Sequence, residues 1–353
     1  MKKIFTKMLI CVLCLTAAFM CACVNNNGET PGGDPQTARL TFYTPDGAPA
    51  LGVAKFIADN ENFGEKNVAI DYNVVSADTI ATYINGANGY GDFVVMPINA
   101  ASKLYKKNAE NPYKMAAVVT HGNLYIMTTE KGLTLGGLVG KTVGVIGQGL
   151  VPDLTLRAAL DKAGLADKVV TGESATEGKI TFRYFSNAQE MMPLLKKGVL
   201  TTGLLPEPAA TNLEKNVAKE KDWERLDVQE LYDAESRSYP QAVLMVKSSV
   251  LSAYPNVLTV MAEKFAAGAE WVRSNPADAV NAINGNVSAK NPGLTPSLSE
   301  KTLNAAAISG CNIFWQAAAS AKAEVKAYIA AINAIDLGLG VKPAAPVGDD
   351  FFA

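Results

Sequence analysis

The stretch GVIGQGLVPDLTLRAAL, residues 144–160, decides how this sequence is interpreted, because it predicts a strand, a glycine loop and a helix in succession. An apolar run before the glycines, followed by apolar residues at helical spacing, is typical of an α/β sheet protein. Such a unit can form a cofactor loop. It can equally form one wall of a pocket that holds a small molecule and does no chemistry.

The residues after the two glycines disfavour a dinucleotide-binding loop. A Rossmann fingerprint needs G-x-G-x-x-G and an acidic residue near the end of the next strand. Here Pro152 stands at the third glycine position, and Glu173 lies in a polar loop rather than at a strand end. No G-K-[ST] follows the loop, which also excludes a P-loop. We therefore expect no cofactor.

Short β-type runs alternate with helical runs from residue 39 onward, and a second series of the same kind begins near residue 142. This alternation predicts an α/β protein with two sheets. The two series are joined near 121–129 and near 239–247, which predicts two lobes, two crossings and a ligand cleft between the lobes. The predicted segments are a signal peptide (1–22), a flexible tether (23–38), the first part of lobe I (39–123), lobe II (124–240), the C-terminal helical part of lobe I (241–340) and a tail (341–353).

The N-terminus predicts export and a lipid anchor. Three lysines precede an uncharged run over residues 8–22, which is shorter than the roughly 20 residues that a membrane-spanning helix needs. The run ends in Met-Cys-Ala-Cys, which is similar to a bacterial lipobox, so that Cys23 would be lipidated and become the first mature residue. The polar segment VNNNGETPGGDPQT that follows is typical of a linker. An ordinary signal peptide that contains cysteines is the alternative.

Charge and cysteine content exclude several classes of function. Loss of residues 1–22 removes three lysines and no acidic residue, which moves the formal charge from −2 to −5, and no basic block of the kind that binds nucleic acid remains. Only Cys311 of the five cysteines lies in the mature body apart from Cys23, so lipidation of Cys23 excludes an intramolecular disulfide. With one histidine in the chain, we expect no metal site.

Two loops of the same design are the main candidates for a ligand site. Each follows the first strand of its series, contains glycine and leads into a helix that begins with proline, Pro49 in one and Pro152 in the other. Free backbone N–H groups at a helix start attract anionic or polar ligand groups. We expect the loops to face each other across the cleft, although two plain βα turns would have the same pattern. The candidate residues are Asp46, Gly47, Ala48, Gly147, Gln148, Gly149 and Asp153.

Further candidates lie at strand ends and at the crossings. His121 has no partner at triad spacing, and both a structural role and a ligand contact stay open. Glu207 stands between two prolines, where it either stabilises a helix start or accepts a hydrogen bond from a ligand. The other candidates are the polar residues Asn99 and Asn123, the strand-end residue Pro206, and the aromatic residues Tyr43 and Tyr239.

Five motifs in order, after the lipobox, carry a resemblance to a known family: TPDGAPAL, DFVVMPINAASKLY, THGNLYIMTT, GKTVGVIGQGLVPDLTLRAAL and GLLPEPAAT. The chain resembles substrate-binding lipoproteins of ABC importers, in the family that binds nitrate, sulfonates, taurine and thiamine-pyrimidine precursors. The resemblance covers about residues 38–335. It implies a two-lobed periplasmic-binding-protein fold of type II with two interlobe crossings. It also implies an extracytoplasmic receptor, anchored by Cys23, that feeds a permease and an ATPase.

Two other functions remain as alternatives. Pyrimidine synthases of thiamine biosynthesis share the fold and are enzymes, but they carry several histidines and a cysteine-rich stretch and are not exported. A surface sensor or adhesin module without a transport role is the other alternative. We expect a monomeric receptor rather than an enzyme.

The charge of the predicted cleft bears on the ligand. Its segments contain no Arg or Lys, and Asp46, Asp153 and Glu207 make them acidic. A buried anion without a compensating charge would be unfavourable there. This favours a neutral or cationic small molecule, such as a heterocycle held between aromatic side chains (Tyr43, Tyr125 or Tyr239), with sulfonate or nitrate as the other possibility.

Overall fold

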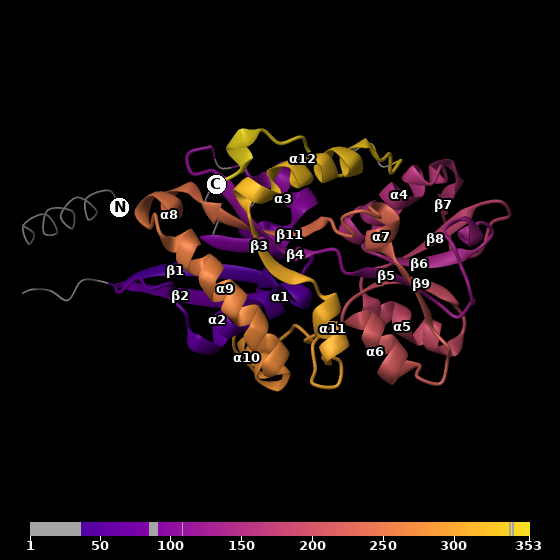
Figure 1. Ribbon diagram of the computed structural model, residues 1–353, viewed down its shortest axis with the longest axis horizontal. Coiled ribbons are helices and arrows are strands. Elements are labelled where there is room, and N and C mark those ends of the chain that lie inside the picture. Colours follow the sequence, from indigo (N-terminus) through magenta and orange to yellow (C-terminus); the bar gives the residue numbers. More distant parts are fainter. Residues whose placement is uncertain (1–36, 85–90, 108, 339, 341) are drawn as a thin grey trace, which may run out of the picture. The chain divides into compact units, whose positions relative to one another are not determined.

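Two six-stranded sheets form the framework of the protein in the computed structural model (Figure 1). The predicted signal peptide, Cys23 and most of the predicted tether lie outside the described residues. Residues Ala38–Ala353 form one unit. The structure describes residues 37–84, 91–107, 109–338, 340 and 342–353.

The first sheet has the strand order β12-β4-β11-β3-β1-β2. Strand β1 pairs in parallel with β2 and β3, whereas β11 is antiparallel to β3 and β4. Runs such as Phe93–Met96 are wholly buried, as expected of strands covered on both faces. The strands are β1 (Ala38–Pro45), β2 (Val68–Val75), β3 (Phe93–Pro97), β4 (Tyr113–His121), β11 (Pro240–Lys247) and β12 (Ile313–Ala317).

The second sheet repeats this plan, with the order β10-β5-β9-β6-β8-β7. Strand β6 pairs in parallel with β8 and β9, and β5 is antiparallel to β9 and β10. In the first sheet β1 lies between β2 and β3, and in the second sheet β6 lies between β8 and β9. This shared arrangement confirms the two predicted α/β series. The strands are β5 (Leu124–Thr128), β6 (Thr142–Ile146), β7 (Val169–Thr171), β8 (Ile180–Phe185), β9 (Thr202–Pro206) and β10 (Glu224–Asp227).

Amphipathic helices cover the sheets. In α9 the buried residues, from Val257 through Met261 and Phe265 to Val272, recur every three or four positions and pack beside α2 and α10. The helices are α1 (Ala48–Gly52), α2 (Ala54–Asp59), α3 (Ile98–Leu104), α4 (Val151–Lys162), α5 (Ala188–Lys197), α6 (Ala209–Asn212), α7 (Val228–Tyr232), α8 (Ser248–Ala253), α9 (Val257–Ser274), α10 (Pro276–Lys290), α11 (Ala305–Gly310) and α12 (Ala318–Ala334). Short 3₁₀ segments are η1 (Ile80–Tyr83), η2 (Gly136–Leu138), η3 (Ala166–Lys168) and η5 (Asp349–Phe351), and η4 (Leu213–Val217) is a π-helical segment.

The chain passes from the first sheet to the second between β4 and β5, and it returns between α7 and β11. We call residues 38–121 and 240–353 lobe I and residues 124–232 lobe II. The two crossings touch, because Gly122 N donates to Tyr239 O at 3.0 Å. A Cβ at Gly122 would lie 2.5 Å from side-chain atoms of both Gln229 and Tyr239, so only glycine fits there.

Helix α12 packs against elements of both lobes, including α3 and α4 (Figure 1). Its Tyr328 hydroxyl lies 2.7 Å from Thr155 Oγ1 of α4. The predicted tail also packs on lobe I, because Ala353 N donates to Met115 O of β4 at 2.9 Å. Among the helices that the structure describes, none has both the length and the hydropathy required to cross a membrane.

Candidate ligand-binding cavity

A cavity of about 510 Å³ lies where the carboxyl ends of strands from both lobes meet. Residues that follow β1, β3, β6, β8 and β9 line it. In each sheet this is the topological switch point. The strands that follow the first strand pair with it on opposite sides, β2 and β3 around β1 in one sheet and β8 and β9 around β6 in the other. Open α/β sheets bind ligands outside the carboxyl ends of their strands at such points. The topology therefore places the cavity where a ligand is expected.

Eight of the residues predicted from the sequence line this cavity. The two glycine loops both contribute, with Gly47 from lobe I and Gly147 from lobe II. Both glycines have positive φ angles, 102° and 65°, a region that favours glycine. The predicted residues in the lining are Asp46, Gly47, Ala48, Asn99, Asn123, Gly147, Pro206 and Glu207.

Six predicted residues lie outside the cavity lining. Tyr239 is fully buried and stacks on Tyr328 with ring centroids 5.4 Å apart, while Tyr43 stacks on Tyr83 at 3.9 Å. Tyr125, also considered as an aromatic contact, is not in the lining either. The six are Tyr43, His121, Gln148, Gly149, Asp153 and Tyr239, although Gly149 O accepts a hydrogen bond from the lining residue Asn99 at 3.3 Å.

His121 packs inside lobe I. Its ring stacks on Phe314 at 3.6 Å, and its Nε2 atom lies 2.9 Å from Gln316 Oε1. Burial lowers the pKa of His121 to about 4, although the Gln316 contact opposes this shift. The imidazole is therefore neutral at physiological pH and outside the cavity.

Asp153 belongs to a buried polar cluster at the start of α4. Its Oδ1 accepts from Arg157 Nε at 2.8 Å and from the Tyr184 hydroxyl at 3.0 Å, and its Oδ2 accepts from Gly149 N at 2.8 Å. The four-residue spacing of Asp153 and Arg157 is a signal for such a helical pair. This arginine neutralises a carboxylate that the sequence analysis counted as an unpaired cleft acid.

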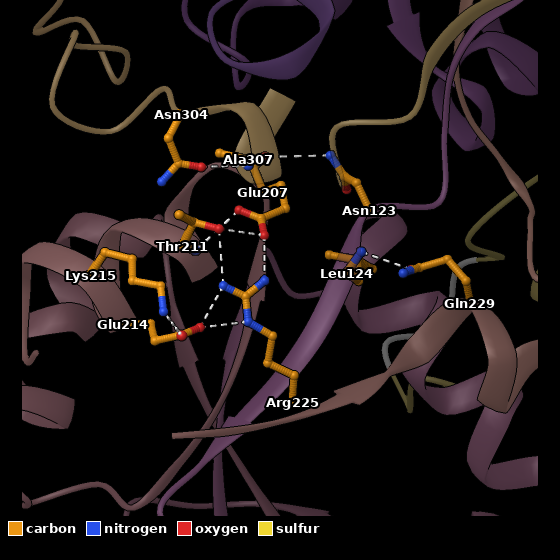
Figure 2. A network of polar contacts seen from close by, with 10 residues as sticks. All are labelled: Asn123, Leu124, Glu207, Thr211, Glu214, Lys215, Arg225, Gln229, Asn304 and Ala307. Atoms are coloured by element: carbon orange, nitrogen blue, oxygen red, sulfur yellow. Dashed lines mark hydrogen bonds and ion pairs between the residues drawn. The ribbon is translucent and has the colours of Figure 1, made fainter. Parts of the chain in front are cut away.

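Glu207 is also neutralised within lobe II (Figure 2). Its Oε1 lies 2.6 Å from Arg225 Nη1 and accepts from the Thr211 hydroxyl at 2.8 Å, while its Oε2 accepts from Thr211 N at 3.1 Å. Arg225 Nε also donates to Glu214 at 2.9 Å. Because Arg225 comes from β10, outside the predicted cleft segments, the acidity expected from those segments alone is an overestimate.

The remaining charge at the cavity comes mainly from lobe I. Among the described residues, the partners of Asp46 are backbone donors: its Oδ1 accepts from Gly47 N at 2.9 Å and its Oδ2 from Ser297 N at 2.7 Å. Asp78, which the sequence analysis missed, is exposed and lines the cavity as well. Among the described residues of the lining, none is Lys or Arg. Apolar side chains such as Leu150 and Met192 complete the wall.

A metal centre has no support in the described part of the chain, where no three His, Cys, Asp or Glu side chains gather closely enough to hold an ion. Cys311 is fully buried, and burial raises the pKa of its thiol well above its usual range. The single thiol of the described body is therefore unsuited to nucleophilic chemistry.

Comparison with known proteins agrees with this geometry. No protein-family model matches the sequence. No curated protein matches it significantly. Among solved structures, an ABC transporter from Parabacteroides distasonis aligns over 90% of this chain and 99% of its own, with 17% identity and a TM-score of 0.67. The protein has the fold of a periplasmic solute-binding protein.

Two sulfonate-binding proteins share this fold. The putative sulfonate-binding protein SsuA from Methylobacillus flagellatus aligns over 90% of this chain and 92% of its own, with 11% identity and a TM-score of 0.59. The aliphatic sulphonate-binding protein SsuA from Escherichia coli aligns over 84% and 86%, with 11% identity and a TM-score of 0.57. At these identities the similarity establishes the periplasmic-binding-protein fold, two-lobed and of type II, and leaves the ligand to be argued from the cavity itself.

Proposed function

We propose that this protein is an extracytoplasmic solute-binding receptor, which captures a small molecule in the cavity and delivers it to the permease and ATPase of an ABC importer. The observation that carries the proposal is the cavity at the switch points of both sheets, lined by residues of both lobes. The shared fold of transport-associated binding proteins supports it. Closure of the lobes around the ligand would then present the loaded form to the importer.

Hydrogen bonds between the lobes support such a closing motion. Asn99 Nδ2 of lobe I donates to Gly149 O of lobe II at 3.3 Å. Asn216 Nδ2 of lobe II donates to Lys301 O of lobe I at 2.8 Å. Asn99 lines the cavity, and Lys301 precedes the lining residue Thr302. These bonds can form when the lobes close and break when they open.

An enzyme on the same fold is the second candidate, and the cavity gives it little support. His121, the one histidine of the chain, is neutral and lies outside the lining. The carboxylates of Asp153 and Glu207 are each held by an arginine. A general base needs a titratable group within reach of the substrate. Apart from Glu207, the described lining offers the carboxylates of Asp46, which accepts from two backbone N–H groups, and of the exposed Asp78, and it contains no histidine. We therefore propose binding without chemistry.

The proposal includes an anchor and an assembly state. Lipidation of Cys23 would hold a monomeric receptor at the outer face of the membrane, near its permease. A sensor or adhesin module without a transport role would have the same anchor. Deletion of the gene in its own cells, followed by an uptake assay, separates these possibilities. Only a receptor for an importer is required for uptake of its own ligand.

A thermal-shift screen tests binding. A ligand stabilises the folded receptor by RT ln(1 + [L]/Kd), which is about 2.7 kcal/mol at a hundredfold excess over Kd. We expect at least one small molecule to raise the melting temperature and to be recovered unchanged. Recovery of a chemically altered molecule would favour the enzyme instead.

A further inference from the structure

We infer that the cavity selects a small molecule that donates several hydrogen bonds and carries no anionic group, such as an amine, an amidine or an aminated heterocycle. This inference rests on the proposed receptor function and specifies its ligand class. Four features of the cavity and its surroundings support it.

The first feature is that backbone donors near the cavity already bond to carboxylates of the chain. Gly149 N, just before α4, donates to Asp153, and Thr211 N of α6 donates to Glu207. In lobe I, Asp46 accepts from two further backbone N–H groups. An anionic ligand would find these donors already bonded, and in lobe I it would also be repelled by the carboxylate of Asp46.

The second feature is the proline content of the same loops. Proline has no backbone N–H, so each proline at a helix start removes one donor that an oxyanion would otherwise bind. Pro49 and Pro152 stand in the first turns of α1 and α4, and both line the cavity. Pro208, just before α6, lines it too. The starts of α1, α4 and α6 therefore each lack one backbone donor that a sulfonate or nitrate could use.

The third feature is the placement of the arginines. Arg157 and Arg225 bond to Asp153 and Glu207, and neither lines the cavity. A ligand carboxylate or sulfonate would therefore be buried without a positive partner from the described lining, which is unfavourable. A neutral or cationic ligand avoids this cost.

The fourth feature is a pair of acceptor oxygens. Asn99 and Asn123 are 3% and 1% exposed, and both line the cavity. Asn99 Nδ2 donates to Gly149 O at 3.3 Å and to Pro343 O at 3.4 Å, while Asn123 Nδ2 donates to Glu207 O at 3.5 Å. The Oδ1 atoms of both amides are buried and have no hydrogen-bond partner among the described residues.

The orientation of these two amides follows from their neighbours. Rotating either amide by half a turn would set its oxygen against a backbone carbonyl oxygen, which is repulsive. The free group is therefore an acceptor in both cases. A buried acceptor without a partner is unfavourable, and an N–H group of a ligand would satisfy it.

Gln241 extends the set of acceptors. It lines the cavity from β11, next to the second crossing, and its Oε1 is buried without a partner in the residues that the structure describes. Asn99 lies on α3 and Asn123 on the first crossing, so the three amides come from three separate elements. Each of the three oxygens is an unpaired acceptor in a residue that lines the cavity, which favours a ligand with N–H groups.

Titration calorimetry on the full chain, processed by its own cells and purified in detergent, tests this inference. One panel contains alkylamines, amidines and aminopyrimidines, and the other contains alkyl sulfonates of matched length, nitrate and sulfate. We expect binding from the first panel only. Binding of a sulfonate, nitrate or sulfate would overturn the ligand class and leave the receptor function standing. Binding from neither panel at millimolar concentration would overturn the receptor function together with this inference.

Asn123→Leu tests the role of the acceptors. It removes the free oxygen and keeps the size of the side chain, so we expect the Kd of the best ligand to rise about tenfold or more. Asn333→Leu is the matched control, because its Oδ1 is also buried and unpaired among the described residues but lies on α12, outside the cavity lining. Melting curves confirm that both variants fold. Equal Kd values for Asn123→Leu and the wild type would contradict the assignment.

Discussion

Lobe I and lobe II hold their carboxylates near the cavity in different ways. In lobe II, Asp153 and Glu207 each form an ion pair with an arginine of the same lobe, at 2.8 Å and 2.6 Å. In lobe I, the partners of Asp46 within the described part of the chain are backbone N–H groups. The lobe II carboxylates are thus structural groups with their charge neutralised. Uncompensated negative charge at the cavity comes from lobe I, where a cationic group of a ligand would bind.

The largest expected effect comes from breaking an ion pair of lobe II. Arg157→Met leaves the fully buried Asp153 without its positive partner, and removal of one partner of a buried pair costs about 3–5 kcal/mol. Urea unfolding measures this loss in the free energy of unfolding. The double variant Arg157→Met/Asp153→Leu is the control, and it should recover part of the loss. If Arg157→Met were as stable as the wild type, the ion pair of Asp153 and Arg157 would not stabilise the fold.

The second-largest expected effect is a pH dependence of stability that comes from His121, at the end of β4 and next to the first crossing. His121 has a pKa of about 4 in the folded chain against 6.5 ordinarily, so the unfolded chain binds this proton more readily. Its contribution to the free energy of unfolding is complete above about pH 6.5, is lost as the pH falls toward 4, and amounts to roughly 3 kcal/mol.

His121→Gln removes this contribution, and the chain has no second histidine to obscure the result. We expect the stability difference between wild type and variant to change across this pH window. Denaturant unfolding at several pH values measures it. Parallel pH profiles for the two proteins would show that the imidazole does not lose its proton affinity on folding.

A contrast between the lobes in ligand affinity is the third prediction. Asp46→Asn should weaken the best amine or amidine ligand about tenfold, a change of about 1.4 kcal/mol, because the charge of Asp46 is not neutralised. Glu207→Gln should change the Kd by less than about threefold, because Arg225 already neutralises that carboxylate. Calorimetry with the same ligand measures both. A larger effect for Glu207→Gln would reverse the comparison.

The smallest effect is expected at the exposed end of the Glu207 network. Lys215 pairs with Glu214, and its side chain is 60% exposed. Because exposed ion pairs contribute little, Lys215→Ala should change the free energy of unfolding by about 0.5 kcal/mol or less. A much larger loss in thermal or urea unfolding would mean that the network acts as a unit.

Local sequence patterns predicted much of this architecture. Strands, glycine loops and proline-led helices depend on neighbouring residues, so both α/β series and both glycine loops followed from the sequence. Gly47 and Gly147 could be placed at the cavity because each follows the first strand of its series. The segment after β9 is less regular than such local patterns indicate, with α-helix over 209–212 and π-helix over 213–217.

The pairing of charges could not be predicted in the same way. Glu207 and Arg225 are 18 residues apart on different elements, and nothing in their spacing indicates a contact. The same holds for Ser297, which reaches Asp46 across 251 residues. Tyr239 was expected at the cleft because it adjoins a crossing, but its side chain packs against Tyr328 of α12, a contact that depends on the tertiary fold.

The most direct test of the account is native mass spectrometry of the protein isolated from its own cells, followed by denaturation and detection of the released molecule. The account predicts one small, non-covalently bound molecule per chain that carries N–H donors and no anionic group. It also predicts that Asn123→Leu retains less of it than Asn333→Leu. Release of a sulfonate or another anion from the wild-type protein would contradict the account, and so would isolation of the protein with no bound small molecule.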